Sequence, residues 1–243
     1  MARTFVIGDI HGALRALEQV LERVKLKADD QLIFLGDYVD GWSQSAQVID
    51  YLMQLEKQYH CTFIKGNHDA WCESWLMGGY PDQTWQFNGG RETVASYDGY
   101  SQSQKNSHII FFNRMKDYVI DAENRLFIHA GFTSMHGPAM ERYDTSYHWD
   151  RTLWEMAITM DKRIKKDSKL FPKRLLVFNE IFIGHTPTIN YDVDIPMNGC
   201  NVWNVDTGAA FYGKLTAMDI DTKKFWQSDP VQQLYPNEKG RNR

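Results

Sequence analysis

The alternation of short apolar runs with helical segments at the start of the chain restricts the fold more than any other feature of the sequence. Runs with strand character lie at residues 4–8, 31–36 and 62–65, and apolar residues recur at helical spacing in residues 13–24 and 45–59. This β-α-β-α-β order predicts a parallel sheet whose strands are joined by right-handed crossovers. The first third of the chain therefore predicts an α/β fold.

The rest of the chain is less regular and ends in segments of strand character. The sequence predicts helices at 69–77, 92–100 and 149–165, paired strands at 117–121 and 125–129, and further strands at 180–184, 201–205, 214–219 and 223–227. We find no internal repeat, linker or low-complexity segment. We therefore expect one domain over residues 1–235, followed by a polar, mobile tail at 236–243.

Composition and charge exclude several classes of protein. The 243 residues are 43% hydrophobic and 24% charged, as in soluble globular proteins, and the formal net charge of −4 gives no basis for nucleic-acid binding by bulk charge. No apolar run reaches the ~18 residues of a membrane span, and a strand-like run starts too close to Met1 to leave room for a signal peptide. Three cysteines without CxxC spacing indicate neither a disulfide framework nor a cysteine zinc site. We expect a cytoplasmic protein that binds no membrane, and the sequence does not indicate its oligomeric state.

Side chains that can bind a metal ion follow six apolar runs, at the point where each run stops. They are Asp9, His11, Asp37, Asp40, Asn67, His68, Asp69, His129, His185 and Asp206. Because the carboxyl ends of parallel strands meet at one edge of a sheet, we expect these residues to converge. Carboxylate, imidazole and amide ligands without thiolate suit Mn, Fe or Zn, and Asp37 could bridge two ions through its two oxygens.

Each of these features also has a structural explanation when taken alone. Asp9 could cap the helix that follows it, and a single buried histidine such as His129 is more often a hydrogen-bonded core residue. The repetition of the same chemistry at six strand ends favours a metal site over a set of unrelated structural residues.

Five short motifs occur in a fixed order along the chain. They are Gly8-Asp-Ile-His-Gly12, Gly36-Asp-Tyr-Val-Asp-Gly41, Gly66-Asn-His-Asp69, His129-Ala-Gly131 and Gly184-His-Thr186. Together they resemble the calcineurin-like metallophosphoesterase superfamily, in particular its phosphoprotein-phosphatase branch. Asn88-Gly-Gly90 and Asp206-Thr-Gly208 resemble the bacterial and phage members of that branch. The resemblance runs from about residue 5 to residue 220.

The resemblance implies a fold and a mechanism. The fold is an α/β (α+β) sandwich of two mixed sheets flanked by helices, with a dimetal site at the carboxyl ends of strands. Asp9 and His11 would bind one divalent ion, Asp37 would bridge, and Asn67, His129 and His185 would bind the other. A hydroxide bridging the ions would attack phosphorus in line, and His68, oriented by Asp40, would protonate the leaving oxygen. We expect manganese, with iron or zinc as alternatives.

Two departures from the family pattern affect substrate binding. Gly41 and Trp42 stand where the family has Arg-Gly, and the later Leu-Trp-x-Arg pattern ends at Met156. Both phosphate-binding arginines are therefore missing in register. Arg91 and Arg151 are replacement candidates, although each could equally be an ordinary surface arginine. Trp42 could form a stacking wall for a nucleobase or an aromatic side chain, or be a core or surface aromatic residue.

Three functions are compatible with this pattern. We expect hydrolysis of a phosphomonoester, as in serine/threonine phosphatases, with a phosphoprotein, a small phosphate ester or a nucleotide as substrate. The alternative is a symmetrical dinucleoside tetraphosphate hydrolase. A metal-binding regulator without catalysis is disfavoured, because every implied ligand and His68 are retained.

Overall fold

The first sheet contains the predicted β-α-β-α-β unit. The computed structural model describes residues 2–242. The strand order is β10-β9-β1-β2-β3, with β1 (Thr4–Ile7), β2 (Gln31–Phe34), β3 (His60–Phe63), β9 (Thr216–Asp219) and β10 (Phe225–Gln227). Strands β1, β2 and β3 are parallel, and β9 pairs antiparallel with β1 and with β10. The sheet is therefore mixed, with its antiparallel strands at one side.

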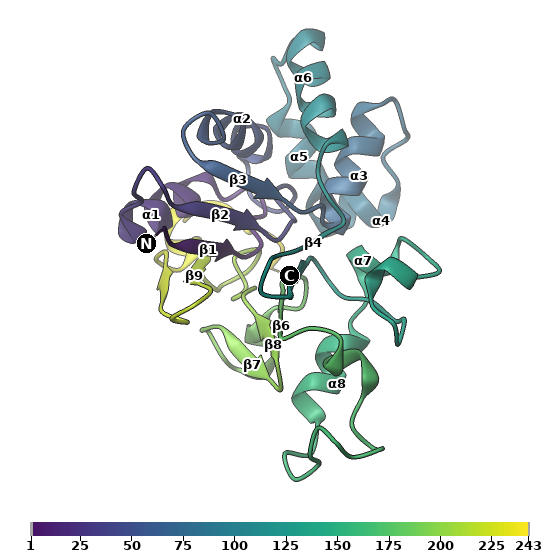
Figure 1. Ribbon diagram of the computed structural model, residues 1–243. Helices are drawn as coiled ribbons and strands as arrows, with labels where there is room; N and C mark the ends of the chain where they lie inside the picture. Colours follow the sequence, from purple (N-terminus) through teal and green to yellow (C-terminus); the bar gives the residue numbers. More distant parts are fainter. Residues whose placement is uncertain (1, 243) are drawn as a thin grey trace.

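The second sheet also has a parallel centre and antiparallel edges. Its order is β4-β5-β6-β8-β7, with β4 (Tyr118–Ile120), β5 (Arg125–Ile128), β6 (Glu180–Ile183), β7 (Met197–Gly199) and β8 (Val202–Asn204). Strands β5, β6 and β8 are parallel, while β4 forms the predicted hairpin with β5. Two five-stranded mixed sheets flanked by helices confirm the predicted fold class (Figure 1).

Helices flank the two sheets. The longer ones are α1 (Leu14–Val24), α2 (Ser45–Leu55), α3 (Asn67–Leu76), α5 (Arg91–Ser96), α6 (Gln102–Asn113) and α8 (Thr152–Thr159). The short ones are α4 (Gln83–Trp85), α7 (Ser146–Trp149), α9 (Val231–Leu234), the π-helical turn η1 (Gln86–Gly90) and the 3-10 turns η2 (Pro138–Met140), η3 (Lys173–Leu176) and η4 (Thr188–Tyr191). Figure 1 shows α1 and α2 beside the first sheet and α8 beside the second. Within residues 2–242, no helix is long and apolar enough to cross a membrane.

The core has three layers because successive strand residues point to opposite faces of a sheet. In β1, Phe5 and Ile7 pack with helices α1 and α2, whereas Val6 belongs to the cluster between the sheets. That central cluster also holds Phe127 of β5 and Phe182 of β6, whose rings stack with centroids 5.0 Å apart. The third layer lies on the outer face of the second sheet, where side chains of β5 and β6 pack with helix α8. Both faces of the sheets are thus buried, which explains the unbroken apolar runs of the parallel strands.

Phe127→Ala should lower the free energy of unfolding by about 3–5 kcal/mol, because it removes a fully buried ring from the centre of the sandwich. Urea unfolding followed by tryptophan fluorescence measures the loss. Phe225→Ala is the matched control: this ring is 37% exposed on edge strand β10, so we expect a loss below about 1 kcal/mol. Equal losses in the two variants would contradict the layer assignment.

Two segments differ from the sequence-based expectation. The helix predicted at 149–165 is interrupted: α7 ends at Trp149, α8 ends at Thr159, and Met160 has extended backbone. The sequence does not predict helix α6, because its apolar residues follow no helical period, although Ser101 and Gln104 form a capping box at its start. Residues 236–242, the tail expected to be mobile, include Glu238, whose carboxylate accepts hydrogen bonds from Ser43.

Candidate functional site

The site forms where the parallel strands of both sheets end. Strands β1, β2 and β3 lead to Asp9, Asp37 and Asn67, and strands β5, β6 and β8 lead to His129, His185 and Asp206. The structure brings these residues together, as expected from the strand ends. A cavity of about 270 Å³ opens over them, and its lining includes His11, Asp37, Asn67, His68, His185 and Asp206.

Asp37 lies at the centre of the cluster. Its Oδ2 is 3.6 Å from His11 Nε2 and 3.4 Å from His129 Nε2. Two groups of potential ligand atoms share Asp37, one with His11 and His68 and one with His129 and His185, and the atoms of each group lie within 4.8 Å of one another. This arrangement is the one that a carboxylate bridging two ions requires.

Backbone carbonyls fix the orientation of two histidines. His11 Nδ1 lies 2.9 Å from the Asp40 carbonyl oxygen, and His129 Nδ1 lies 2.8 Å from that of Leu35. A carbonyl oxygen only accepts, so each Nδ1 carries a hydrogen, and Nε2 is the ring nitrogen that faces the cluster. Both rings are therefore set for ligation through Nε2.

The turns that carry the site residues have an uncommon backbone conformation. The φ angles of His11, Asp37, Asp40 and His185 are 53°, 53°, 72° and 67°. Positive φ costs a residue other than glycine about 1–3 kcal/mol and persists only where neighbouring contacts impose it. Asp69 imposes it at Asp37, because its carboxylate accepts hydrogen bonds from the backbone N–H groups of Asp37 and Tyr38. Asp69 thus shapes the turn rather than facing the cavity.

The electrostatics of the site favour a bound cation. Burial and the charge of Asp206 raise the pKa of Asp9 well above its usual value, and burial raises the pKa of Asp206 to about 6. His185 Nε2 is buried without a hydrogen-bond partner among the described residues. Clustered acids and an unpartnered imidazole nitrogen, all oxygen and nitrogen donors, fit divalent ions of the Mn, Fe or Zn type.

His68 and Asp40 form a buried pair beside the cluster. His68 Nδ1 is 2.6 Å from Asp40 Oδ2, and the same carboxylate accepts hydrogen bonds from Thr93 Oγ1 (2.6 Å) and Trp85 Nε1 (2.7 Å). Burial raises the pKa of Asp40 to about 8 and lowers the pKa of His68 to about 3. Since Nδ1 is bonded to Asp40, Nε2 is the ring nitrogen free to act on another molecule.

The three predicted substrate-binding residues lie in different places. Arg151 is exposed and lines the same cavity as the candidate ligands. Arg91 is also exposed but lines a neighbouring cavity. Trp42 is not a wall of either cavity: it is fully buried, donates from Nε1 to the Ala209 carbonyl oxygen at 2.7 Å and stacks on Tyr235. The stacking role expected for Trp42 is therefore wrong, because core packing encloses the ring.

Several residues of the site carry no sequence signal. Arg241 lines the cavity of the candidate ligands but lies beyond residue 220, where the family resemblance ends. Trp71 and Trp149 also line it, with ring centroids 5.0 Å apart, and contact His68 and His185 edge to face. No motif singles out these aromatic residues, because their positions depend on how separate helices pack.

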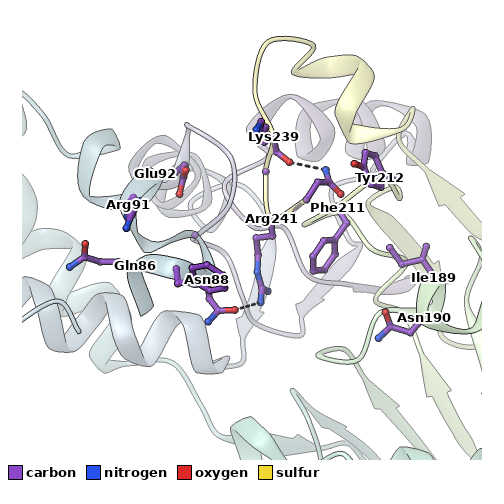
Figure 2. Close-up of a pocket in the computed structure, with 14 residues that line it drawn as sticks. Gln86, Asn88, Arg91, Glu92, Ile189, Asn190, Phe211, Tyr212, Lys239 and Arg241 are labelled. Atoms are coloured by element: carbon purple, nitrogen blue, oxygen red, sulfur yellow. Dashed lines mark hydrogen bonds between the residues drawn. The ribbon is translucent and has the colours of Figure 1, made fainter. Parts of the chain in front are cut away.

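A second, larger cavity of about 880 Å³ adjoins the first. Its lining includes Gln86, Phe87, Arg91, Ile189, Tyr212 and Lys239. Four further residues line both cavities: Asn88, Asn190, Phe211 and Arg241. Figure 2 shows Arg241 between Asn88 and Phe211. The two cavities therefore share a wall that Arg241 helps to form.

Comparison with known proteins gives consistent results. The profile of a family described as calcineurin-like phosphoesterase matches residues 2–212. The chain is 27% identical over 235 residues to bis(5'-nucleosyl)-tetraphosphatase PrpE [asymmetrical] of Oceanobacillus iheyensis, covering 90% of this chain and 89% of the relative. It is 39% identical over 67 residues to a symmetrical bis(5'-nucleosyl)-tetraphosphatase of Pseudomonas putida, covering 27% of this chain and 23% of that relative.

Two solved structures share the fold. A candidate diadenosine tetraphosphatase superposes with a TM-score of 0.63 and 17% identity, covering 93% of this chain and 92% of the other. A protein serine/threonine phosphatase of Saccharomyces cerevisiae, similar to human PP5, superposes with a TM-score of 0.59 and 14% identity, covering 95% of this chain and 83% of the other.

Proposed function

Because this chain belongs to the calcineurin-like phosphoesterase family and is a metal-dependent hydrolase, we propose that its substrate is a nucleoside polyphosphate of the dinucleoside tetraphosphate class. The observation that carries the proposal is the cavity of about 880 Å³ that adjoins the candidate metal centre. If one phosphate were held at the metal centre, the larger cavity would have room for the other phosphates and a nucleoside. The PrpE relatives, named as tetraphosphatases, support the same substrate class.

The chemistry of the larger cavity suits such a ligand. Phe211 and Tyr212 offer aromatic surface on which a nucleobase could stack. Lys239 and Arg241 offer positive charge to phosphate groups, and Asn190 offers an amide to a base or a ribose. A phosphoserine side chain would use little of this surface.

We assign the site residues as follows within this proposal. Asp9 and His11 would hold one divalent ion, Asp37 would bridge, and Asn67, His129 and His185 would hold the other. Manganese is the expected metal, with iron and zinc as the alternatives that these donors admit. When bound, two such ions supply an activated water and stabilise the charge that develops on the phosphoryl oxygens.

The chain's own acid is His68. Its Nε2 would give a proton to the leaving oxygen while Nδ1 stays bonded to Asp40. The Asp40 side chain holds the ring in place, and Thr93 and Trp85 in turn hold Asp40. Trp71 and Trp149 would limit the access of bulk water to this proton.

The His68–Asp40 pair also favours a second candidate, hydrolysis of a phosphomonoester of serine or threonine. An alkoxide is a poor leaving group and needs protonation more than a polyphosphate does, so a dedicated acid suits an alkyl ester. The fold shared with the yeast serine/threonine phosphatase is compatible with this candidate.

A substrate panel separates the two candidates. Metal-replete protein, with its metal content measured, would be assayed on diadenosine tetraphosphate, p-nitrophenyl phosphate, bis-p-nitrophenyl phosphate and a phosphoserine peptide. We expect the highest kcat/KM on diadenosine tetraphosphate, and ATP with AMP as products, as the name of the PrpE relatives implies. ADP as the sole product would indicate symmetrical cleavage instead. The highest kcat/KM on the phosphopeptide would overturn the proposal in favour of the second candidate, and no turnover of any substrate would exclude both.

A further inference from the structure

We propose that Arg241 binds the substrate phosphate from the C-terminal side of the chain, in place of the arginine that the family carries at the position of Gly41. We name residues 236–242 the C-terminal strap. The inference rests on the proposed phosphate-cleaving function but not on the choice between its two substrate classes. It assigns a substrate-binding residue outside the part of the chain that the family profile matches, residues 2–212.

Three contacts fix the course of the C-terminal strap. Tyr235, just before it, stacks on Trp42 with ring centroids 5.2 Å apart. The Glu238 carboxylate accepts hydrogen bonds from the backbone N–H of Ser43 at 3.0 Å and from its hydroxyl at 2.8 Å. The backbone N–H of Arg241 donates to the Ala210 carbonyl oxygen at 2.9 Å. The strap thus runs across the turn that follows Asp40 and carries Arg241 to the cavity.

One of the two departures from the family pattern, Gly41-Trp42, makes room for the strap. A Cβ at Gly41 would lie 3.3 Å from Arg241 Cγ, so a long side chain at residue 41 would compete with Arg241 for space. A Cβ at Gly240 would lie 2.6 Å from the Trp42 ring, so the strap packs its backbone directly on that ring. Gly41 and Trp42, which offer no cationic side chain to bind phosphate, are therefore the residues that the strap packs against.

The guanidinium of Arg241 is placed to receive an anion. Its Cζ lies 5.3 Å from the centroid of the Phe211 ring, and Nη2 donates to Asn88 Oδ1 at 3.3 Å (Figure 2). Within residues 2–242 this is its only side-chain hydrogen bond, and it forms no ion pair with a carboxylate of that range. Most of its five N–H donors are therefore available, in a planar fork that matches two phosphate oxygens.

Of Arg91, Arg151 and Arg241, only Arg241 lines both cavities. It lines the cavity of the candidate ligands together with Asp37 and His68. Arg91 lines only the larger cavity. The position of Arg241 beside both cavities suits a phosphate held at the metals with its substituent in the larger one.

Arg241→Ala tests the proposal in the full-length, manganese-loaded protein. We expect KM for diadenosine tetraphosphate to rise about 10–100-fold, because two charged hydrogen bonds are lost, with a smaller change in kcat. The Kd of inorganic phosphate, measured by calorimetry without turnover, should rise by a similar factor. Arg241→Lys should recover only part of both, since lysine keeps the charge but not the fork.

Arg163→Ala is the control, because it removes an exposed arginine that lines neither cavity and pairs with Asp161. Thermal unfolding and metal content should match the wild type in all variants. Unchanged KM and phosphate Kd in Arg241→Ala would overturn the proposal. Tighter phosphate binding by this variant would also overturn it, because the strap would then obstruct the site. So would a wild type that binds no phosphate. A wild type that binds phosphate but cleaves no substrate would instead count against the proposed function.

Discussion

Asp37→Asn should lower kcat by about 10³-fold or more on any substrate that the wild type cleaves. Its Oδ2 lies between His11 and His129, at 3.6 Å and 3.4 Å from their Nε2 atoms, where it can serve two ions at once. The amide has nearly the same shape but only one oxygen and no charge, so it can satisfy at most one ion. We expect the variant to retain fewer than two metal ions per chain after gel filtration, as measured by elemental analysis.

Asp98→Asn provides the matched control, because Asp98 is exposed and lies outside the cavity of the candidate ligands. It should keep both the metal content and kcat of the wild type. Near-wild-type turnover in Asp37→Asn, or two retained metal ions, would refute the bridging assignment. The metal measurement separates a lost ion from a damaged fold, which circular dichroism would report independently.

His68→Ala should lower kcat about 10²–10⁴-fold for substrates with poor leaving groups. The reason is the loss of the proton that Nε2 delivers, since the ring is held by Asp40 through Nδ1 at 2.6 Å. An aryl phosphate leaves readily without a proton, so its loss should be much smaller. Comparing kcat for an alkyl and an aryl phosphate in both proteins measures this difference, and the metal content should stay at the wild-type value.

His148→Ala is the control for His68→Ala. His148 also pairs with an aspartate, Asp117, at 3.1 Å, but it does not line the cavity of the candidate ligands. It should leave kcat unchanged. An equal loss of kcat on alkyl and aryl substrates in His68→Ala would show that His68 does not act as the acid. A loss of bound metal would indicate that His68 is a ligand, which its place near His11 and Asp37 also allows.

The convergence of the candidate ligands could be predicted from the sequence because local rules suffice for it. Each residue follows an apolar run, the runs form parallel strands, and parallel strands end at one edge. Asp9 and His185 are 176 residues apart, yet the His185 backbone N–H donates to the Asp9 carboxylate at 3.1 Å. The β-α-β-α-β start and the β4–β5 hairpin follow from the same periodicity.

The remaining features could not be predicted because they depend on contacts between distant segments. Arg241 reaches the cavity only because Trp42, Ser43 and Ala210 hold the C-terminal strap, and no local pattern encodes those contacts. Trp42 was ambiguous for the same reason: a tryptophan after a turn can stack on a ligand or fill a core. In the structure, Tyr235 stacks on the Trp42 ring, which therefore fills the core.

The positive φ angles of His11, Asp37, Asp40 and His185 set stability against function in this protein. Glycine adopts such angles without cost, so replacing any of these residues by glycine removes backbone strain and the functional side chain together. A library of variants selected for heat resistance alone would therefore be expected to accumulate glycine at these positions and lose the site residues. Laboratory evolution of a more robust variant should hold these four positions fixed and seek its gains elsewhere in the sandwich.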